Sequence, residues 1–464
     1  MARSKKAAAV LTPEEKLQQA LVPVDDHPYE IPENWCWVKF EYLAKDMADG
    51  PFGSNLKTEH YTNNKEARII QLGNVSENGW RDENVKYTTF EHAQTISRSI
   101  VEAGNIVITK MMPAGRAMIC PADEKMYVLS SDNVKMVPHD SLNVQYLVYG
   151  INSYVFNNQV QENTQGITRA RTSIKKLKSY SFPLCPVLEQ QRIVDRIESI
   201  FAKLDEAKEK AQAVVDGFEL RKSAILHKAF TGELTAQWRQ EHGVALDSWT
   251  DTTVGSISDV KGGKRVPKGM SLTNVDTGHP YIKAGNLKQG TVIDDGMMYV
   301  PDEVLKYIKN YTVNAGDVYI TNVGACIGDC GVIPEKYDGA NLTENAVKMT
   351  NLNCISRFLA MQLASGTVQQ GIKNLIASAT LGKLSIANIK TIPVALPTDD
   401  EQTEIIKIVD SIFYKEQQAK EAAEAVINQI DTMKKAVLAR AFRGELGTND
   451  PNEESAIELL KTIL

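Results

Sequence analysis

The residues of this 464-residue chain that are best suited to chemistry are cations, and the densest group of them is Lys261-Gly262-Gly263-Lys264-Arg265. Lysine and arginine beside glycines present positive charge together with open backbone donors, which suits them to contact an anion such as phosphate. A solvated basic turn has the same composition. The run therefore indicates an anion-binding loop without establishing one.

Motifs for catalysis are missing from the sequence. It contains no Walker phosphate loop, nucleotide-binding fingerprint, His-x-Glu or His-Glu-x-x-His metal motif, or Gly-x-Ser-x-Gly nucleophile turn. Asp49-Gly50-Pro51-Phe52 faintly resembles the Asp/Asn-Pro-Pro-aromatic loop of DNA amino-methyltransferases, but it lacks the second proline and no glycine-rich cofactor turn accompanies it. The sequence predicts no catalytic residue and no cofactor bound by this chain.

Cysteines and histidines give no sign of a disulfide framework or a metal site. The six cysteines do not match between the two halves of the chain, and the seven histidines are scattered. Cys326 and Cys330 lie in a glycine-rich turn without further Cys or His ligands, so we expect them to pack rather than to bind metal. This cysteine usage indicates a reducing compartment. The apolar patch near the N-terminus is too short for a signal sequence or a membrane span, so we expect a cytoplasmic protein with no membrane partner.

The net charge of −6 is unevenly distributed. Residues 399–464 hold 8 Lys and Arg against 14 Asp and Glu, whereas residues 34–185 hold 17 against 15 and residues 248–398 hold 14 against 12. A phosphate-bearing partner needs local positive potential rather than a positive total. The two long stretches are mildly basic, which is compatible with nucleic acid and equally with an ordinary folded domain.

The chain repeats itself once, at a shift of 212 residues. Glu189-Gln190 recurs as Glu401-Gln402, and Ala229-Phe230-Thr231-Gly232-Glu233-Leu234 recurs as Ala441-Phe442-Arg443-Gly444-Glu445-Leu446. Solenoid repeats are only about 20 to 50 residues long, so a period of this length makes each copy a domain with a connector. We expect an internal duplication with pseudo-twofold symmetry.

Each copy ends in a long amphipathic helix. Apolar residues recur at helical spacing between Glu189 and Phe230, and again between Glu401 and Ala441. A single apolar stripe of that length needs a partner, and the economical partner is the other copy, which gives an antiparallel coiled-coil pair. Two helices each packed on its own domain are the alternative. The predicted seam and docking face consists of Ile193, Ile197, Phe201, Leu204, Ile405, Val409, Ile412 and Phe413.

The parts before the helices predict an α+β fold. Short apolar runs between Gly, Asn and Asp turns predict strands, and helical patterns follow them in both copies, so each domain is mixed α/β. The predicted order is an N-terminal arm with a short helix capped at Thr12 (1–33), a first domain (34–185), a first spacer helix (186–234), a linker with a second domain (235–398), a second spacer helix (399–446) and an acidic C-terminal tail (447–464). Within the tail we expect a solvated linker at 450–454 and a last helix from Ser455 to Leu464.

This combination resembles the specificity subunit of a Type I restriction-modification system over nearly the whole chain. The most specific signals are Glu189-Gln190-Gln191 and the two Ala-Phe-x-Gly-Glu-Leu motifs, supported by Asp49-Gly50-Pro51-Phe52-Gly53-Ser54 and Gly285-Asn286-Leu287. Thr403 departs from the pattern, because it stands where the first copy has Gln191. The resemblance implies two target recognition domains separated by the antiparallel helices, each reading one half of a split, asymmetric sequence in double-stranded DNA.

The resemblance also implies the partners of the chain. The helices would dock two methyltransferase subunits, and restriction subunits would join that complex. The chain itself would be non-catalytic and would direct an N6-adenine methyltransferase and an ATP-dependent endonuclease. S-adenosylmethionine, ATP and Mg are accordingly expected on the partner subunits.

Candidate DNA-contacting residues follow from the chemistry of readout. Base edges are read by Arg, Lys, Asn or Gln, and phosphates are held by cations and hydroxyls. The candidates in the first domain are Lys57, Arg68, Gln71, Asn74, Lys110, Arg116, Arg169 and Arg171, and those in the second are Lys261, Lys264, Arg265, Lys268, Lys283, Asn286 and Asn322. Gly73-Asn74 and Gly285-Asn286 occur in both domains, so they are better suited to support the fold or contact the DNA backbone than to distinguish bases.

The alternative from another class is a structural adaptor that joins protein partners through its long helices and binds no DNA. Mild basicity does not exclude it. Salt distinguishes the two, because DNA binding weakens steeply as salt rises.

Overall fold

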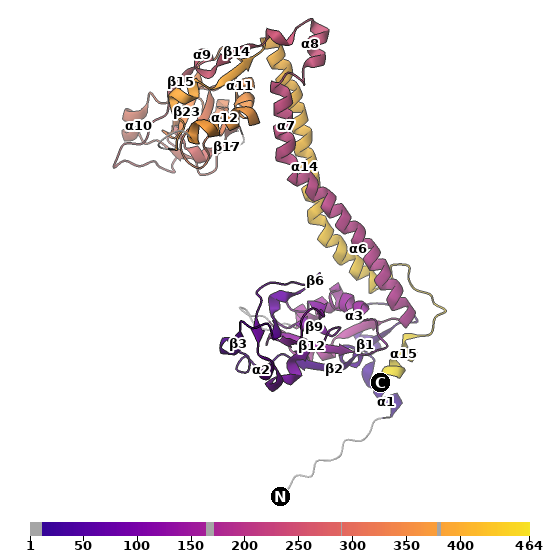
Figure 1. The fold of residues 1–464 in the computed structure, drawn as a ribbon. Coiled ribbons are helices and arrows are strands. Elements are labelled where there is room, and N and C mark those ends of the chain that lie inside the picture. The colour runs from indigo at the N-terminus through magenta and orange to yellow at the C-terminus, as the bar shows by residue number, and fades with distance from the viewer. Residues whose placement is uncertain (1–11, 164–170, 289, 378–381) are drawn as a thin grey trace. The chain divides into compact units, whose positions relative to one another are not determined.

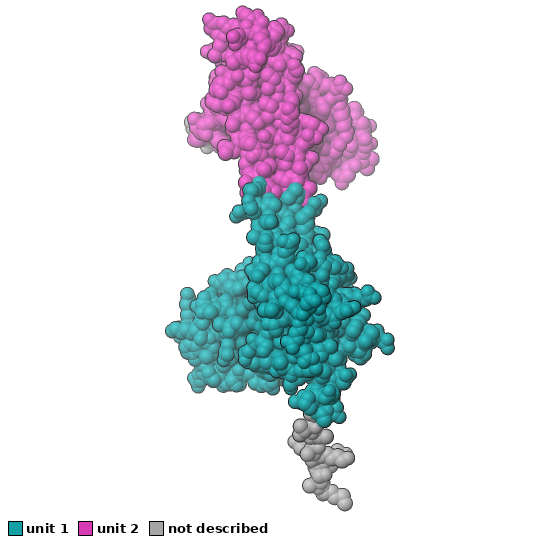
Figure 2. Space-filling model, turned by 90° about the vertical axis from the view of Figure 1, so that its right-hand side faces the viewer, with its two compact units in different colours: residues 1–210, 426–464 teal, residues 211–425 magenta. Residues whose placement is uncertain are grey.

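The structure is a computed structural model, and it describes residues 12–163, 171–288, 290–377 and 382–464. Contacts divide the chain into two compact units, residues 1–210 with 426–464 and residues 211–425 (Figure 2). Each unit contains one mixed domain and a length of paired helix. The predicted α+β class with two mixed domains is confirmed.

The first domain contains two main sheets. The four-stranded sheet has the order β10-β9-β12-β2 and is antiparallel throughout, and the five-stranded sheet has the order β3-β7-β4-β11-β8 with β4 parallel to β11. A third pair, β1 with β13, joins the beginning of the domain to its end. The strands are β1 (Cys36–Lys39), β2 (Ala44–Asp49), β3 (Tyr61–Thr62), β4 (Ala67–Ile70), β7 (Tyr87–Thr88), β8 (Ile100–Val101), β9 (Ile106–Thr109), β10 (Ala117–Ile119), β11 (Tyr127–Leu129), β12 (Asn133–Pro138) and β13 (Ser181–Leu184). The helices are α2 (Phe90–Thr95), α3 (Val144–Ile151), α4 (Tyr154–Glu162) and α5 (Ile174–Ser179).

The second domain repeats this plan. Its four-stranded sheet has the order β15-β23-β20-β21, its three-stranded sheet has the order β19-β16-β22, and β14 pairs with β24. The strands are β14 (Thr250–Thr253), β15 (Asp259–Gly262), β16 (Pro280–Ile282), β19 (Met298–Tyr299), β20 (Val318–Thr321), β21 (Cys330–Val332), β22 (Asn341–Leu342), β23 (Ala346–Thr350) and β24 (Pro393–Leu396). The helices are α9 (Val254–Ile257), α10 (Asp302–Ile308), α11 (Ser356–Leu363), α12 (Gly366–Ala377) and α13 (Ile386–Lys390).

The two domains share connectivity and register as well as element types. Val134 faces Ile108 in the first four-stranded sheet, and Val347 faces Ile320 at the same place in the second. Both domains also contain one parallel pair, β4 with β11 and β16 with β22. The duplication that recurring motifs predicted is therefore a duplication of the fold.

The first long helix is interrupted, which the sequence analysis did not predict. The chain forms α6 (Val187–Asp216) and α7 (Phe218–Phe230), which meet at Gly217, whereas α14 (Asp399–Ala441) is unbroken (Figure 1). A Cβ at position 217 would lie 2.5 Å from Nη1 of Arg221. Nη2 of Arg221 donates to the carbonyl of Val214, 2.8 Å away. Glycine, a weak helix former, thus leaves room for an arginine that crosses the helix.

The helices pair antiparallel within each unit. In the first unit, Lys434 bonds to Asp205 at 2.6 Å and Lys208 approaches Asp431 at 3.6 Å. In the second unit, Arg221 bonds to Glu416 at 2.7 Å. The ammonium of Lys222 lies over the ring of Phe413, and that of Lys420 over the ring of Phe218. In both units the partner numbers fall along one helix as they rise along the other, so the antiparallel pairing is confirmed.

The predicted seam residues differ in burial and in the elements that cover them. Ile193 and Ile197 are fully buried in a core that contains the first domain and the end of α14, and Ile405 and Val409 pack against α7 and α11. Phe201, Leu204, Ile412 and Phe413 are half-buried. The first turns of each long helix thus pack both on their own domain and on the end of the other long helix. A stripe at helical spacing does not by itself reveal which partner covers each part of it.

The helices nearest the two chain ends lie side by side in the first unit. The predicted capped helix is α1 (Pro13–Ala20), where Thr12 and Glu15 bond reciprocally, and the predicted last helix is α15 (Ala456–Ile463). The acidic linker before α15 is not simply solvated, which corrects the prediction. Both carboxylate oxygens of Glu453 accept from the guanidinium of Arg192, at 2.7 and 2.8 Å. A bidentate arginine at the start of α6 holds this part of the tail in place.

Candidate nucleic-acid interface

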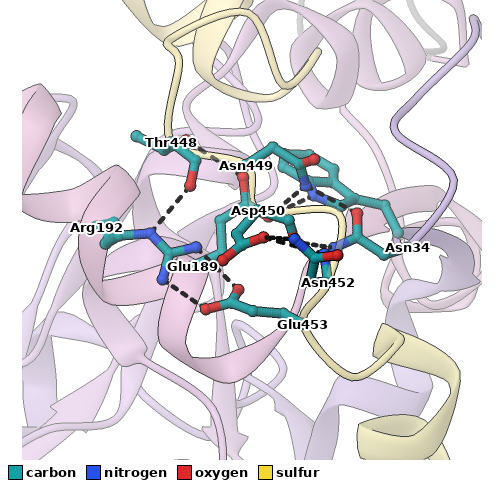
Figure 3. A network of polar contacts seen from close by, with 9 residues as sticks. Asn34, Glu189, Arg192, Thr448, Asn449, Asp450, Asn452 and Glu453 are labelled. Carbon is teal, nitrogen blue, oxygen red and sulfur yellow. Dashed lines mark hydrogen bonds and ion pairs between the residues drawn. The ribbon is translucent and has the colours of Figure 1, made fainter.

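The repeated Glu-Gln motif closes the base of each domain. In the first unit, the fully buried carboxylate of Glu189 accepts from Nε1 of Trp35 at 2.7 Å, Nδ2 of Asn449 at 2.9 Å and Oγ1 of Thr448 at 3.2 Å. Figure 3 shows this carboxylate among polar residues of α6 and of the C-terminal segment. Asn34 extends the network by accepting from Asn449 and donating to the carbonyl of Asp450.

Glu401 makes the equivalent contacts in the second unit. It accepts from Nη1 of Arg239 at 2.6 Å, from Oγ1 of Thr235 at 2.7 Å and from Nε1 of Trp249 at 2.9 Å. In both units the tryptophan that donates to the carboxylate lies at the beginning of the domain. The threonine that donates its hydroxyl comes after an Ala-Phe-x-Gly-Glu-Leu motif. Thr448 follows the second motif but serves the first domain, and Thr235 follows the first motif but serves the second domain. Each copy therefore contributes the segment that closes the base of the other copy's domain.

The neighbouring glutamines explain the rest of the motif. Gln190 accepts from the amide of Asn143 and donates to the carbonyl of Cys185, while Gln402 accepts from the amide of Ile355 and donates to the carbonyl of Pro397. Each glutamine ties the start of its long helix to a helix of its domain and to the domain's exit. The motifs thus hold each domain in a fixed pose on its helix.

With this base in place, a corner of the first domain gathers several charged side chains. Lys110 follows β9, and its Nζ donates to Asp49 at the end of β2, 2.6 Å away. The amide of Lys110 bonds to the carbonyl of Asp132, and its carbonyl accepts from the amide of Thr172. Arg171, which is exposed, pairs through its backbone with Met111. The backbones of Lys110 and Arg171 are therefore neighbours at this corner, where the side chain of Lys110 is 16% exposed.

The same corner exists in the second domain with different side chains. The amide of Asn322 bonds to the carbonyl of Asn345, and its carbonyl accepts from the amide of Leu384, which repeats the pattern at Lys110. The basic loop runs beside it, because the amide of Lys264 bonds to the carbonyl of Leu342 and Nε of Arg265 bonds to Glu344 at 2.6 Å. The structure therefore brings Lys264, Arg265 and Asn322 together.

A glycine at the same position in each domain sets the conformation of the loop at the corner. The amide of Gly50 bonds to the carbonyl of Asn133, and that of Gly263 to the carbonyl of Ala346. A Cβ would lie 1.9 Å from the carbonyl oxygen of Ser130 at Gly50, and 2.1 Å from that of Thr343 at Gly263. Only glycine allows this close approach, which aligns the loop after β2 with the loop after β15.

Three candidates that were expected on the recognition surface lie in the interior, and their placement is corrected. Arg68 is 1% exposed, pairs with Asp82 at 2.9 Å and lies over the rings of Trp80 and Tyr87. Asn74 and Asn286 are also 1% exposed. Each asparagine accepts from the amide three residues earlier and donates to two later carbonyls, so their amide groups are used in turns of the domain. This agrees with the expectation that the repeated Gly-Asn supports the fold.

The remaining candidates lie outside the two corners. Lys57 and Lys268 are exposed, and Lys57 lies near Glu59. Lys261 is exposed on β15 and pairs with Asp259 at 3.1 Å. Three others are half-buried, namely Gln71, Arg116, which lies 3.9 Å from Glu77, and Lys283, which donates to the carbonyl of Gly296. Arg169 lies outside the described residues.

The sequence analysis missed a cleft next to the first corner. It has a volume of about 630 Å³, and its lining includes residues 47–52 together with Arg98, Lys175 and Lys178. The signal for two of these cations was present as the basic run at 175–178, close to Arg171. Arg98 had no such signal. Within the described residues, no three His, Cys, Asp or Glu side chains gather as they would around a metal ion, and no helix is long and apolar enough to cross a membrane.

The fold defines a class of protein in which a mixed domain with a long helix occurs twice. Each domain is closed at its base by the other copy, and each presents the same corner. The profile of the family described as "Type I restriction modification DNA specificity domain" matches residues 45–215 and 247–429. The chain belongs to this family and is a specificity subunit of the Type I restriction-modification class.

Individual relatives agree with this assignment. The chain is 22% identical over 322 residues to the EcoBI specificity subunit of Escherichia coli, with 67% of each chain covered. It is 21% identical over 323 residues to the EcoKI specificity subunit of E. coli strain K12, with 65% of each covered. Among solved structures, the HsdS subunit of Thermoanaerobacter tengcongensis has a TM-score of 0.61 at 17% identity, covering 91% of this chain and 100% of that one. A chain from a study of complex assembly in a type I R-M system has a TM-score of 0.62. At these identities the solved structures support the fold alone.

Proposed function

We propose that this chain reads a bipartite, asymmetric target in double-stranded DNA, one half-site per domain. The observation that carries the proposal is the pair of equivalent corners, which combine one backbone frame with different polar side chains. Readers of two different half-sites need a common scaffold and divergent contacts. Lys110 and Arg171 would serve the first half-site, and Lys264, Arg265 and Asn322 the second.

We further propose that the helices dock two methyltransferase subunits and that restriction subunits join the complex. Four large apolar side chains on α7 and α14 stay exposed, namely Leu220 (76%), Tyr414 (66%), Met433 (45%) and Val426 (42%). Exposed apolar side chains on an otherwise charged helix suit a protein partner. None of the four belongs to the predicted seam, so the docking face would be separate from the seam. The chain would be non-catalytic, with S-adenosylmethionine, ATP and Mg bound by the partners.

The deciding experiment is to co-express the chain with its neighbouring candidate methyltransferase and to map N6-methyladenine across the host genome by single-molecule sequencing. The expected result is a motif of two short specific halves around a gap of fixed length. A stable complex that produces no such motif would contradict DNA specificity and favour the adaptor alternative.

Corner variants sharpen the test. Lys264→Ala with Arg265→Ala should relax only one half of the motif, and Lys110→Ala with Arg171→Ala only the other half. Lys309→Ala is the matched control, since Lys309 is an exposed lysine of the second domain that is not among the candidate DNA contacts. If either pair of substitutions weakens both halves equally, the assignment of one half-site to each domain is wrong.

A further inference from the structure

The loop after β2 carries an aromatic side chain that the fold does not use. Phe52 is 83% exposed, the largest exposed fraction among the large apolar residues that the structure describes as exposed. An exposed phenylalanine would be unremarkable on a mobile surface loop. This loop is fixed, because Gly50 is wedged beneath the carbonyl of Ser130, Pro51 is buried, and the amide of Asn55 bonds to the carbonyl of Phe52 at 2.7 Å.

The surroundings of Phe52 are basic. Phe52 lines the cleft of about 630 Å³ together with Arg98, Lys175 and Lys178. Asp49 is the one acidic residue among the lining residues, and its carboxylate is paired with Lys110 at 2.6 Å. An aromatic ring beside a cationic cleft matches a ligand that has both flat rings and phosphates. A membrane surface would not explain the cleft.

The second domain presents a different residue at the same position. Gly50 corresponds to Gly263, because their amides make the same sheet contact, so Phe52 corresponds to Arg265. The side chain of Arg265 is 77% exposed. Both loops therefore project the residue two places after the glycine, one as an aromatic ring and one as a guanidinium. Arginine contacts base edges or phosphates, whereas an aromatic ring contacts bases by stacking or by wedging between base pairs.

We propose that Phe52 stacks on, or wedges into, a base step of the half-site that the first domain reads, while Arg98, Lys175 and Lys178 hold the adjacent phosphates. The inference rests on the proposed function, since it requires that this domain binds DNA. Unstacking at this step distorts the duplex and adds discrimination through the deformability of the sequence, at a position that no hydrogen-bonding side chain needs to read.

The test uses the full complex with its methyltransferase and duplexes that carry the mapped target, with 2-aminopurine placed at successive positions of the first half-site. With the wild-type complex, fluorescence should rise at one step of that half-site. Phe52→Ala should abolish the rise and weaken binding about tenfold. It should leave the slope of affinity against salt unchanged, because no cation is lost. Phe52→Trp should restore both signals.

Controls separate the possible failures. Tyr154→Ala removes an exposed aromatic ring of the same unit outside the corner and should change neither signal. If the wild-type complex binds the target with steep salt dependence but Phe52→Ala binds equally well, the role of Phe52 is wrong and the proposed function stands. If Phe52→Ala instead loses the methyltransferase in gel filtration, Phe52 serves a protein contact and the inference is overturned. If the wild-type complex shows no salt-dependent binding to the target, the proposed function itself fails.

Discussion

Substitution of Glu401 by alanine should open the base of the second domain. Glu401 is fully buried, and the side chain of Arg239 is only 9% exposed, so the substitution leaves a guanidinium inside the protein without its counter-ion. Removing one partner of a buried ion pair costs about 3 to 5 kcal/mol. The two neutral donors, Thr235 and Trp249, lose less than the buried charge does, and Nη2 of Arg239 keeps its bond to the carbonyl of Gly232. We expect a loss of about 4 kcal/mol in the local stability of this base.

Native-state hydrogen exchange with mass spectrometry measures this loss directly. About 4 kcal/mol corresponds to roughly a thousandfold faster exchange in peptides from residues 232–250 and 399–405, whereas peptides from residues 34–38 should be unaffected. Glu421→Ala is the matched control on the same helix, because Glu421 is exposed and accepts only from the side chain of Gln417. Its effect should stay within about 0.5 kcal/mol.

A paired substitution separates the charge effect from the packing effect. Glu401→Leu with Arg239→Met removes both charges and keeps apolar bulk, so it should recover more than half of the loss, since replacing a whole buried pair is often nearly neutral. Protection that stays within threefold of wild type in Glu401→Ala would refute the reasoning. So would a double variant no more stable than Glu401→Ala.

Three further predictions follow from the same contacts. Glu189→Ala should lower the local stability of the first base by about 1 to 3 kcal/mol, less than Glu401→Ala does at the second, because the donors Trp35, Thr448 and Asn449 are neutral. Hydrogen exchange in peptides from residues 34–38 measures this loss. A loss equal to that of Glu401→Ala would contradict the argument from charge. Gly50→Ala should destabilise the first domain by about 1 to 3 kcal/mol in urea unfolding. Gly53→Ala in the same loop should be neutral, since a Cβ there meets no atom within 4 Å. Equal unfolding midpoints for the two variants would show that the contact at Gly50 is not tight. Burial raises the pKa of the Cys36 and Cys330 thiols to about 12, so little thiolate exists at pH 8. Maleimide should therefore label the exposed Cys326 first, and Cys36 and Cys330 only after unfolding. Comparable labelling rates for these three cysteines in the folded protein would refute this.

Recurrence made the architecture predictable from the sequence. Glu189 and Glu401 lie 212 residues apart in identical contexts, and a repeat this exact in spacing fixes the number of domains and the place of the helices. The partners of these carboxylates were not predictable. Arg239, Trp249 and Thr235 are separated from Glu401 by more than 150 residues in sequence, and no local pattern marks them.

The candidate interface was predictable only in part, for a related reason. Residue type selects cations, but burial decides which of them remain available. Arg68 lies on β4, where its neighbours Trp80, Tyr87 and Asp82 come from other segments and enclose the guanidinium. Phe52 is the opposite case, because an apolar ring is more often buried, whereas this one is exposed on a loop whose Gly50 is wedged against the carbonyl of Ser130. Single-residue chemistry could not settle either case without the tertiary contacts.

The base of each domain is closed by residues of the other copy, so the duplication has a structural consequence. Glu189 of the first copy depends on Thr448 and Asn449, which follow the second copy's motif, and Glu401 of the second copy depends on Thr235 and Arg239, which follow the first. A single copy alone would leave its buried carboxylate without these donors, and an unpaired buried carboxylate is costly. Each domain is therefore complete only when both copies are present. Within the described residues, the corner loops share no hydrogen bond with these networks, so their side chains can diverge, as Phe52 and Arg265 have, while the Glu-Gln motifs stay the same in both copies.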